Sequence, residues 1–326
     1  IALSTVGGWL ACRGAGQLSN RYGKIEDMVL GLEVVLASGQ VVATGGYARS
    51  ATGPDLNQLF VGSEGTFGII TSAELHIHRT PAHRTKSAWG FDSFAAANEA
   101  VRRIIQRGAR TAVLRVNDKD ESARTYDTGD LHLLIAMDEG DPEIVDAAMR
   151  VVEQECADAE DLGEGLVNQW LEHRNDVAGL EALTQRHYVV DTMEVSVPWS
   201  AVGRAYDEVR AALLNVDGID IATAHQSHAY SDSACLYFTF AGKPDAARIQ
   251  ETYIAAWDAG TRAALAVGAS LSHHHGVGLN RGRFMAEALG EGFEVLQTLK
   301  QALDPNGILN PGKLGLGHGF GEVPFP

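Results

Sequence analysis

The chain has 326 residues, 45% of them hydrophobic and 21% charged, which allows one large core or two and excludes a disordered or fibrous protein. Its formal net charge of -16 disfavours non-specific binding to nucleic acid or to an anionic membrane surface. The three cysteines, Cys12, Cys156 and Cys235, have no paired spacing, so we expect no disulfide framework, no zinc ribbon, and a reducing, cytoplasmic compartment.

Residues 1 to about 80 are rich in glycine and β-branched residues. Two strands joined by a turn at Ser38 and Gly39 are predicted by "DMVLGLEVVLASGQVVATGG", a short helix by "TGPDLNQLF" and a further strand by "TFGIITSAELHIHR". The apolar stretches stop short of the roughly 20 residues that a membrane span needs. The first residue is Ile1, inside a segment that reads as structured, so we expect the natural N-terminus to lie upstream.

From about residue 85 the pattern predicts a β-α-β-β-α series, which then repeats between about 188 and 266. Ser93 is the expected cap of the first helix, and an arginine row on that helix reads as its solvated face. Asp141 and Pro142 open the second helix, with an apolar face that we expect at Ile144, Ala148, Val151 and Val152. Two ferredoxin-like halves would share one antiparallel sheet, with helices on one face and the other face free to cover a pocket.

A loop with three histidines, "SHHHGVG", precedes the last predicted helix, "RFMAEALGEGFEVLQTLKQAL". In an extended segment His273 and His275 would share one side and His274 would point to the other. A metal site would need further ligands such as His225 or His228 and has no supporting carboxylate spacing, so we expect no metal. A loop-closing cluster stays an alternative, but the neighbouring glycines and the near-neutral pKa of histidine favour proton transfer.

Two glycine loops, "STVGGWLACRGAG" and "VGSEGTFGII", offer consecutive backbone N–H groups and small side chains. Such loops can receive a diphosphate or a flat ring, although neither matches a Walker A loop or the dinucleotide fingerprint. On spacing alone, tight turns in a β-rich domain explain them better.

Six motifs occur in this order: "STVGGW", "RYGKIEDMV", "TGPDLNQLFVGSEGTFGIIT", "ACLYFTF", "SHHHGVG" and "DPNGILNPGK". With them the chain resembles the FAD-binding oxidases of the vanillyl-alcohol oxidase (PCMH) type, and within that family the alkylglycerone-phosphate synthase branch and its bacterial relatives. The resemblance runs over nearly the whole chain. It implies an α+β fold: residues 1–82 as the second subdomain of an FAD-binding domain whose first subdomain is missing here, residues 83–278 as a duplicated ferredoxin-like substrate or cap domain, and residues 279–326 as a C-terminal helix and tail returning to the FAD domain.

The resemblance also implies roles for individual residues. FAD-binding positions are Ser4, Thr5, Gly7, Gly8, Ala11, Cys12, Arg13, Gly14, Ser63, Glu64, Gly65, Thr66, Phe67, Gly68 and Ile69. Catalytic positions are Tyr237, as proton donor and acceptor, the active-site histidines His273, His274 and His275, and Arg115. Tyr237 could instead be a core residue, and Arg115 could simply pair with Asp118.

The implied reaction replaces the acyl group of a glycerone-phosphate-like lipid precursor by a fatty alcohol, without net redox change. The family's phosphate-binding arginine falls at Leu180, so we expect Arg174, Arg281 or Arg283 to bind substrate phosphate, or a substrate without phosphate. An FAD-linked oxidoreductase of a 2-hydroxy acid or polyol phosphate and a truncated non-catalytic relative stay alternatives. We further expect a homodimer, a small-molecule or lipid-like substrate, no nucleic acid and no transmembrane segment, with peripheral membrane contact left open.

Overall fold

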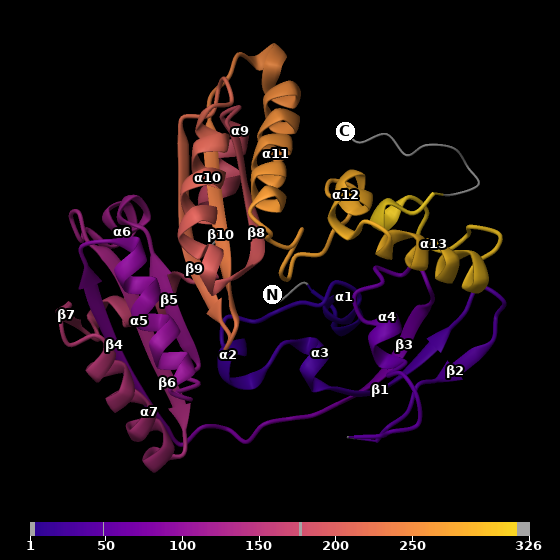
Figure 1. Ribbon diagram of the computed structural model, residues 1–326, viewed down its shortest axis with the longest axis horizontal. Coiled ribbons are helices and arrows are strands. Elements are labelled where there is room, and N and C mark those ends of the chain that lie inside the picture. Colours follow the sequence, from indigo (N-terminus) through magenta and orange to yellow (C-terminus); the bar gives the residue numbers. More distant parts are fainter. Residues whose placement is uncertain (1–3, 48, 176–177, 318–326) are drawn as a thin grey trace. The chain divides into compact units, whose positions relative to one another are not determined.

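The structure, a computed structural model, describes residues 4–47, 49–175 and 178–317 (Figure 1). The chain forms two compact units, the first made of residues 1–16, 23–78 and 271–326 and the second of residues 17–22 and 79–270. Each unit has its own hydrophobic core. Residues 318–326 of the expected C-terminal tail lie outside the described range.

The first unit is built on a three-stranded antiparallel sheet in the order β2-β1-β3. The predicted turn between its first two strands is confirmed, with Gly39 at a φ of 84° that a side chain would disfavour. The helices and strands of this unit are α1 (Val6–Ala11), α3 (Ile25–Met28), β1 (Val29–Val35), β2 (Val41–Ala43), α4 (Asn57–Phe60), β3 (Ile69–Leu75), α12 (Met285–Leu289) and α13 (Gly292–Leu303).

The last predicted helix is two helices rather than one. Gly290 has a φ of 53° and ends α12, and α13 begins two residues later. The single-helix prediction was therefore wrong, because a left-handed glycine breaks the helical hydrogen-bond ladder although the apolar spacing continues past it.

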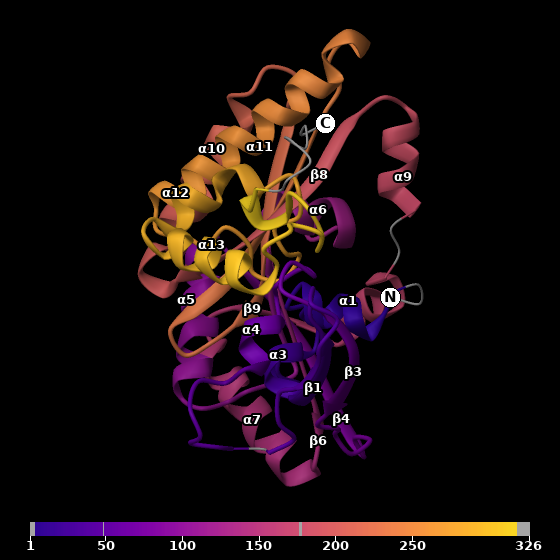
Figure 2. The same cartoon turned by 90° about the vertical axis from the view of Figure 1, so that its right-hand side faces the viewer.

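The second unit is an α+β layer, which confirms the predicted fold class. Its seven-stranded antiparallel sheet has the order β7-β4-β6-β5-β9-β10-β8. The elements are α2 (Ser19–Tyr22), β4 (His83–Phe91), α5 (Phe94–Gln106), β5 (Val113–Asn117), α6 (Lys119–Tyr126), β6 (His132–Gly140), α7 (Pro142–Glu155), β7 (Glu160–Gly163), α8 (Gly165–His173), α9 (Ala178–Gln185), β8 (Val189–Pro198), α10 (Val202–Leu214), β9 (Ile221–Ala229), β10 (Ser233–Gly242) and α11 (Ile249–Ala266). Figure 2 shows the chain running from α9 into β8.

The two halves of this sheet are ferredoxin-like, but they are not equal. The first half contributes four strands in the order β7-β4-β6-β5, and the second contributes three in the order β9-β10-β8. They meet where β5 pairs with β9. Figure 1 shows α5 and α7 beside the first half and α10 and α11 beside the second. No strand among the described residues follows α11 to complete the second half.

Side chains alternate between the two faces of the sheet, as extended strands require. Leu114, Leu236 and Phe238 join the core beneath the helices. Arg115 and Tyr237, each one residue along from a core position, therefore face the opposite side. We call this side, opposite the helical layer α5, α7, α10 and α11, the open face. Over the first half of the sheet it is packed by an apolar cluster around Val167 and Trp170 of α8.

The predicted N-caps of α5 and α7 are confirmed, and the predicted apolar face of α7 is confirmed only in part. Ser93 accepts the N–H of Ala96 at the start of α5. On α7 the buried residues are Val145, Met149 and Val152, whereas Ile144 is 59% exposed. The prediction is confirmed for Val152 and in part for Ala148 and Val151, which pack against the core while partly exposed, and it was wrong for Ile144. The spacing of apolar residues fits two faces that differ by one residue, or about 100° of helix.

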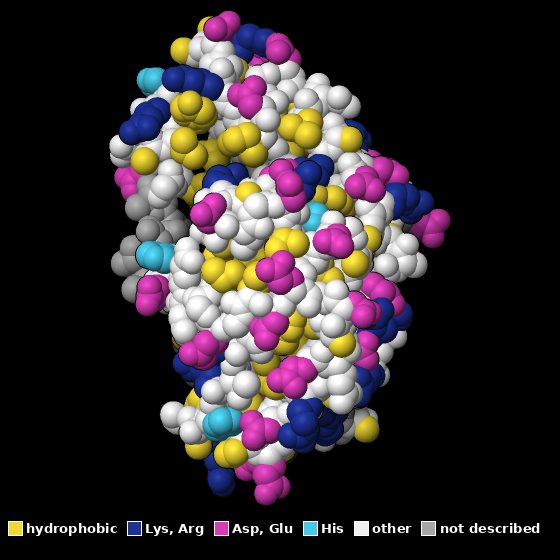
Figure 3. All heavy atoms as spheres, turned by 90° about the vertical axis from the view of Figure 1, so that its left-hand side faces the viewer, with side chains coloured by type: hydrophobic (Ala, Val, Ile, Leu, Met, Phe, Trp, Pro, Cys, Tyr) yellow, Lys and Arg dark blue, Asp and Glu magenta, His cyan; other side chains and the backbone are white. Residues whose placement is uncertain are grey.

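The arginine row of α5 is neutralised by carboxylates. Glu155 accepts hydrogen bonds from Arg103 and Arg107, and Arg102 pairs with Glu99. Figure 3 shows one face of the molecule, on which acidic and basic side chains are interspersed. The row is thus the solvated helix face that the sequence predicted rather than a free cationic patch. Within the described residues, no helix is long and apolar enough to cross a membrane.

Candidate functional site

The first glycine loop of the first unit begins with a helix whose start is fixed by hydroxyl groups. The Thr5 Oγ1 atom accepts the N–H of Gly8 at 3.1 Å, and the Ser4 hydroxyl accepts the indole N–H of Trp9 at 2.8 Å. Thr5 is therefore the N-cap of α1, a position that favours Ser and Thr. A Cβ at Gly7 would meet no atom within 4 Å, so the main chain there is open to a ligand.

The two glycine loops lie against each other. The N–H of Gly62 donates to Leu10 at 2.8 Å, and the N–H of Glu64 donates to Ala11 at 2.9 Å. Arg13, with a φ of 53°, donates to the carbonyl of Val61. The predicted FAD-binding stretches, about fifty residues apart in the sequence, are thus joined main chain to main chain.

The second glycine loop presents main-chain donors that lack partners. Gly65, Phe67 and Gly68 have no hydrogen bond from their N–H groups among the described residues. Ser63 and Thr66 hold the turn from within, because the Ser63 hydroxyl donates to Phe60 and the Thr66 hydroxyl donates to Ser63. Buried N–H groups without partners are rare, so these donors point to a ligand. The last residue of the stretch, Ile69, begins β3 and is 56% exposed.

Glu64 connects the glycine loops to the histidine loop. Its carboxylate accepts the backbone N–H groups of Val277 and Gly278, the latter at 2.9 Å. Asn310 donates to the carbonyl of Glu64. A Cβ at Gly276 would come within 2.7 Å of the Glu64 carboxylate, so the close approach requires glycine. Three segments predicted from separate motifs therefore meet at one residue, Glu64, through its carboxylate and its main-chain carbonyl.

The three histidines do not alternate between two sides, and that expectation was wrong. The Nδ1 atoms of His273 and His274 lie 2.9 Å apart, and the rings of His274 and His275 are 4.4 Å apart between centroids. Residues 273–275 form bends rather than a strand, so the extended-chain argument does not apply. His273 is buried, His274 is half-buried and His275 is exposed. Lys24 fixes the start of the loop by donating to the carbonyl of His273 at 2.8 Å.

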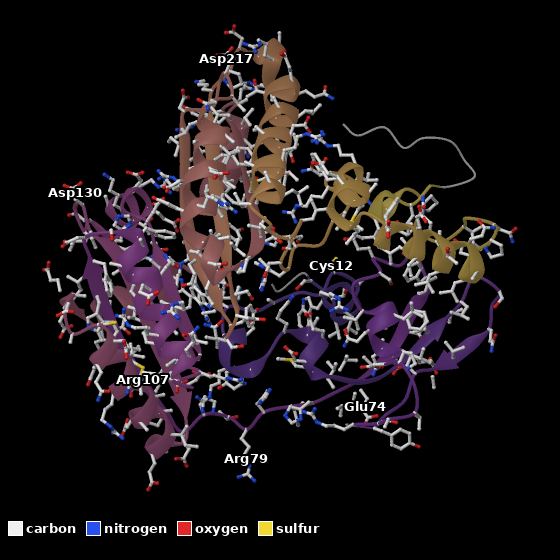
Figure 4. The ribbon with its side chains drawn as sticks, in the orientation of Figure 1. Cys12, Glu74, Arg79, Arg107, Asp130 and Asp217 are labelled. Atoms are coloured by element: carbon white, nitrogen blue, oxygen red, sulfur yellow. The ribbon has the colours of Figure 1, made fainter. Side chains whose placement is uncertain are left out.

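Cys12, labelled in Figure 4, is the C-cap of α1 and lies near Gly276. Burial, followed by the charge of Glu64, raises the pKa of its thiol. The neutral thiol is a small packing residue, because the reactive species of cysteine is the thiolate.

The "DPNGILNPGK" motif anchors the C-terminal segment beneath the second glycine loop. The Lys300 ammonium donates to the carbonyls of Thr66 and Leu309 at 3.0 and 2.7 Å and pairs with Asp304. Asp304 also accepts the N–H groups of Ile308 and Leu309. Lys300 and Asp304 are both buried, so this cluster fixes the carbonyl side of the loop whose N–H groups are open.

In the second unit, Arg115 and Tyr237 belong to one chain of contacts across the open face. Arg115 donates to Asn117 and Glu121, each at 2.9 Å. The other carboxylate oxygen of Glu121 lies 3.1 Å from Nδ1 of His225. The ring of His225 stacks on Tyr237, with centroids 4.6 Å apart and planes 13° from parallel.

The chain of contacts ends at β8, where the Tyr237 hydroxyl donates to Thr192 at 3.0 Å. Burial raises the pKa of the Tyr237 phenol despite that hydrogen bond. The phenol is therefore a neutral donor near pH 7. Tyr237 does not belong to the apolar core of the helical face, which was the alternative that its alternating strand left open.

Arg115 does not pair with Asp118, which the sequence had offered as an alternative. Asp118 caps α6 by accepting the N–H of Glu121, accepts the N–H of Ala224 at 2.7 Å, and lies 3.7 Å from Arg210. The helix α6 was not predicted. Its signal is Asp118 followed three residues later by Glu121, the spacing of a capping box.

The three arginines expected at a substrate phosphate have different surroundings. Arg281 is buried and donates to the carbonyl of Gly276 at 2.7 Å, so it supports the histidine loop. Arg283 lies over the ring of Phe284. Arg174 lies 5.4 Å from the centroid of Trp170 and has no carboxylate partner among the described residues. Leu180, at the position matched to the family's arginine, is 40% exposed on α9.

Sequence reasoning missed Glu121 and gave His225 only as a conceivable metal ligand. Their connection comes from strand register, since His225 lies opposite both Asn117 and Tyr237. A bulge at Ser227 is needed for this register, because Cys235 pairs with His228 and the next residue, Leu236, pairs with Gln226. Odd spacing along β9 gave no hint that His225 and His228 face the same side.

Comparison with known proteins gives two family matches. The profile described as "FAD linked oxidases, C-terminal domain" matches residues 80–314, and that of an FAD binding domain matches residues 1–45. Alkyldihydroxyacetonephosphate synthase of Trypanosoma brucei brucei is 32% identical in an alignment 351 residues long, which covers 96% of this chain and 56% of that protein. An uncharacterised FAD-linked oxidoreductase of Escherichia coli O157:H7 is 29% identical in an alignment 332 residues long, which covers 96% of this chain and 68% of that protein.

A solved structure gives the same similarity in three dimensions. An alkyldihydroxyacetonephosphate synthase has a TM-score of 0.75 and 28% identity, with 95% of this chain and 59% of that chain covered. The chain spans little more than half the length of the synthases that it matches.

Proposed function

Because the chain belongs to the FAD-linked oxidases, for which the cofactor is FAD, we propose that it acts in alkyl-for-acyl exchange on a glycerone-phosphate-like lipid precursor. The observation that carries the proposal is the Glu64 connection, which joins both glycine loops to the histidine loop. The similarity to alkyldihydroxyacetonephosphate synthase over nearly the whole chain supports the substrate class.

The residues of the first unit fit FAD. The N–H groups of Gly65, Phe67 and Gly68 have no protein partner among the described residues, and the main chain at Gly7 is open. Flavin carbonyls and diphosphate oxygens are acceptors that such donors would hold. FAD bound there supplies an electron-accepting ring. The predicted FAD-binding residues would hold and orient that ring, and Glu64 would keep the histidine loop at a fixed position beside the glycine loops.

Proton transfer in the proposed reaction is assigned to Tyr237, His273 and His274. Tyr237 is a neutral donor whose hydroxyl is oriented by Thr192. The Nδ1 atoms of His273 and His274 are in close contact, so protonation of one ring disfavours protonation of the other. Arg115 would orient the substrate through its guanidinium, which two hydrogen bonds hold in place.

Phosphate recognition is assigned to Arg174. Of the three candidate arginines, Arg281 is buried in the support of the histidine loop, whereas Arg174 has a guanidinium without a carboxylate partner among the described residues. An arginine in this state can give a phosphate two parallel hydrogen bonds.

The proposal is tested with the full-length, FAD-loaded protein, acyl-glycerone phosphate and a long-chain alcohol. Mass spectrometry should find the alkyl ether product and free fatty acid in equal amounts, and the flavin absorbance should be unchanged at the end. Release of fatty acid without ether product would contradict the exchange.

A second function is favoured by Leu180, the residue that the family resemblance matches to a phosphate-binding arginine. This function is the oxidation of a 2-hydroxy acid or polyol phosphate, in line with the FAD-linked oxidoreductase of Escherichia coli. Anaerobic addition of such a substrate would then bleach the flavin absorbance and leave it bleached. A preparation of the full-length protein that lacks flavin absorbance would contradict both functions.

A further inference from the structure

The open face of the second unit carries a carboxylate–imidazole pair that the proposed function does not use. Glu121 uses one carboxylate oxygen for Arg115 and the other for Nδ1 of His225. Both side chains are well shielded, with His225 only 8% and Glu121 only 12% exposed. This geometry fixes the tautomer of an imidazole, because the Nδ1–H donates to the carboxylate and leaves Nε2 as the acceptor.

Asp118 fixes the positions of Glu121 and His225 through hydrogen bonds to α6 and β9. Glu121 lies in the first turn of α6, where its own N–H is bound by the Asp118 side chain. Asp118 is in turn fixed by the N–H of Ala224, on the same strand as His225. The carboxylate and the imidazole are thus attached to one network that spans α6 and β9.

Three hydrogen-bonding groups in this cluster have no partner among the described residues. They are the Nε2 acceptor of His225, the Nη1 donor of Arg115 and the buried Nδ2 donor of Asn117. The Asn117 amide is oriented by its own oxygen, which accepts Nε of Arg115. A buried donor without a partner costs free energy, so a ligand atom or a water belongs beside it.

We propose that His225 is a proton-accepting residue of a substrate subsite, that Glu121 is its positioning residue, and that Arg115 and Asn117 bind the neighbouring substrate oxygen. One acceptor beside two donors suits a compound with a hydroxyl or acyloxy group on the carbon next to a carbonyl or carboxylate. Acyl-glycerone phosphate and the 2-hydroxy acids of the proposed function have this feature, whereas a polyol phosphate lacks the carbonyl group. The assignment of the subsite to catalysis rests on that function.

The transfer is a simple one. The O–H or C–H bond next to the carbonyl breaks, its electron pair stays on the substrate, and the proton forms a new N–H bond at Nε2 of His225. The charges that face His225 are those of Glu121 on α6 and Arg115 on β5, with the neutral phenol of Tyr237 on β10. The imidazolium that results is balanced by the Glu121 carboxylate.

The protonation states agree with this direction of transfer. Burial, followed by the charge of Arg115, lowers the pKa of His225, so the ring is neutral and ready to accept near pH 7. Burial alone would raise the pKa of Glu121, but the contact with His225 and the charge of Arg115 outweigh it and hold the pKa at about 2.

The first experiment reads the subsite without any turnover. The full chain is labelled with ¹⁵N and ¹³C at histidine and titrated by NMR with glycolate, with glycerone phosphate and with acetate, which lacks the hydroxyl group. We expect the free protein to show the Nδ1–H tautomer at His225 and Glu121→Gln to show a mixture of tautomers. Glycolate or glycerone phosphate should shift the His225 signals at concentrations at least tenfold below those that acetate needs.

His132 is the matched control in the same spectra. It is another buried sheet histidine with a pKa lowered by burial, but it lies against Phe94 rather than Glu121. Its signals should not move. A response to glycolate alone would assign hydroxy acids, and a response to glycerone phosphate alone would assign hydroxy ketones. Unchanged His225 signals with both compounds would overturn the subsite.

The second experiment tests the proton step on whichever substrate the enzyme turns over. With His225→Gln we expect kcat/KM to fall by about two orders of magnitude and the acid limb of its pH profile to disappear. An unchanged profile would overturn the catalytic role. A protein without turnover on either substrate class would refute the proposed function and the catalytic role of His225 together. His225 signals that still respond in that protein would establish a binding subsite alone.

Discussion

The carboxylate of Glu64 accepts the N–H of Gly278 at 2.9 Å, across 214 residues of sequence. This contact makes the second glycine loop and the histidine loop parts of one structure. The carboxylate of Glu64, rather than a glycine or a histidine, therefore connects these two loops of the first unit.

We expect Glu64→Gln to weaken FAD retention and lower the melting temperature of the full-length protein. Gln cannot give two charged acceptor oxygens to the N–H groups of Val277 and Gly278, and charged hydrogen bonds contribute roughly 1.5–3 kcal/mol each. Flavin absorbance after gel filtration measures retention. The control is Glu74→Gln, at an exposed carboxylate of the same unit, which should retain flavin like the wild type. Equal retention in both variants would show that the Glu64 contact is dispensable.

Tyr237→Phe should reduce turnover by about two orders of magnitude or more and leave the fold intact. The change removes only the hydroxyl group that donates to Thr192, while the ring keeps its stacking on His225. Steady-state rates and circular dichroism provide the two measurements. Wild-type turnover in this variant would remove Tyr237 from the mechanism.

His274→Ala should also reduce turnover by about two orders of magnitude with the fold retained. The half-buried ring is lost together with its contacts to His273 and His275. His83→Ala, at a partly exposed histidine of the second unit, serves as the control and should retain full activity. If both variants turn over at the wild-type rate, the histidine loop has a structural role only.

Lys300→Met should destabilise the protein by about 3 kcal/mol, because it leaves the Asp304 charge buried without its partner. Burial alone would raise the pKa of Asp304, but the Lys300 hydrogen bond and two backbone N–H groups hold it below the ordinary value of 3.8. A lowered pKa stabilises the folded state above pH 3.8, and this contribution is lost as the pH falls through the folded-state value. Urea unfolding at pH 7 and pH 3 measures both effects. The gap between wild type and Lys300→Met should narrow at the lower pH, and a constant gap would contradict the Asp304 assignment.

Arg174→Gln should raise KM for a phosphate-bearing substrate by about tenfold and leave kcat nearly unchanged. This corresponds to the loss of about 1.4 kcal/mol of binding free energy that the bound substrate and the transition state share. The control, Arg110→Gln, removes an exposed arginine of the same unit and should keep the wild-type KM. Should the two variants have the same KM, phosphate is recognised elsewhere or the substrate carries none.

Local patterns predicted most of the secondary structure and the fold class. Caps such as Ser93 and the turn at Gly39 depend on a few neighbouring residues, which the sequence displays directly. The exposure of Ile144 on α7 and the break at Gly290 were missed because apolar spacing alone fits more than one arrangement. Contacts such as Glu64 with Gly278, or Glu121 with His225, join distant segments through topology and register. The roles of the residues named by resemblance stay predictions, whereas the meeting of the two glycine loops with the histidine loop is a property of the first unit.

The bulge at Ser227 accommodates one extra residue in β9, because Cys235 pairs with His228 and the next residue, Leu236, pairs with Gln226. In a regular strand, residues three positions apart lie on opposite faces, so the bulge is what brings His225 and His228 to the same side. A deletion of Ser227 would leave these histidines two positions apart, and a regular strand would still place both on one face. Straightening the strand with all its residues kept would instead turn one imidazole toward the helical layer, so the length of β9 and its hydrogen-bond register can change only together.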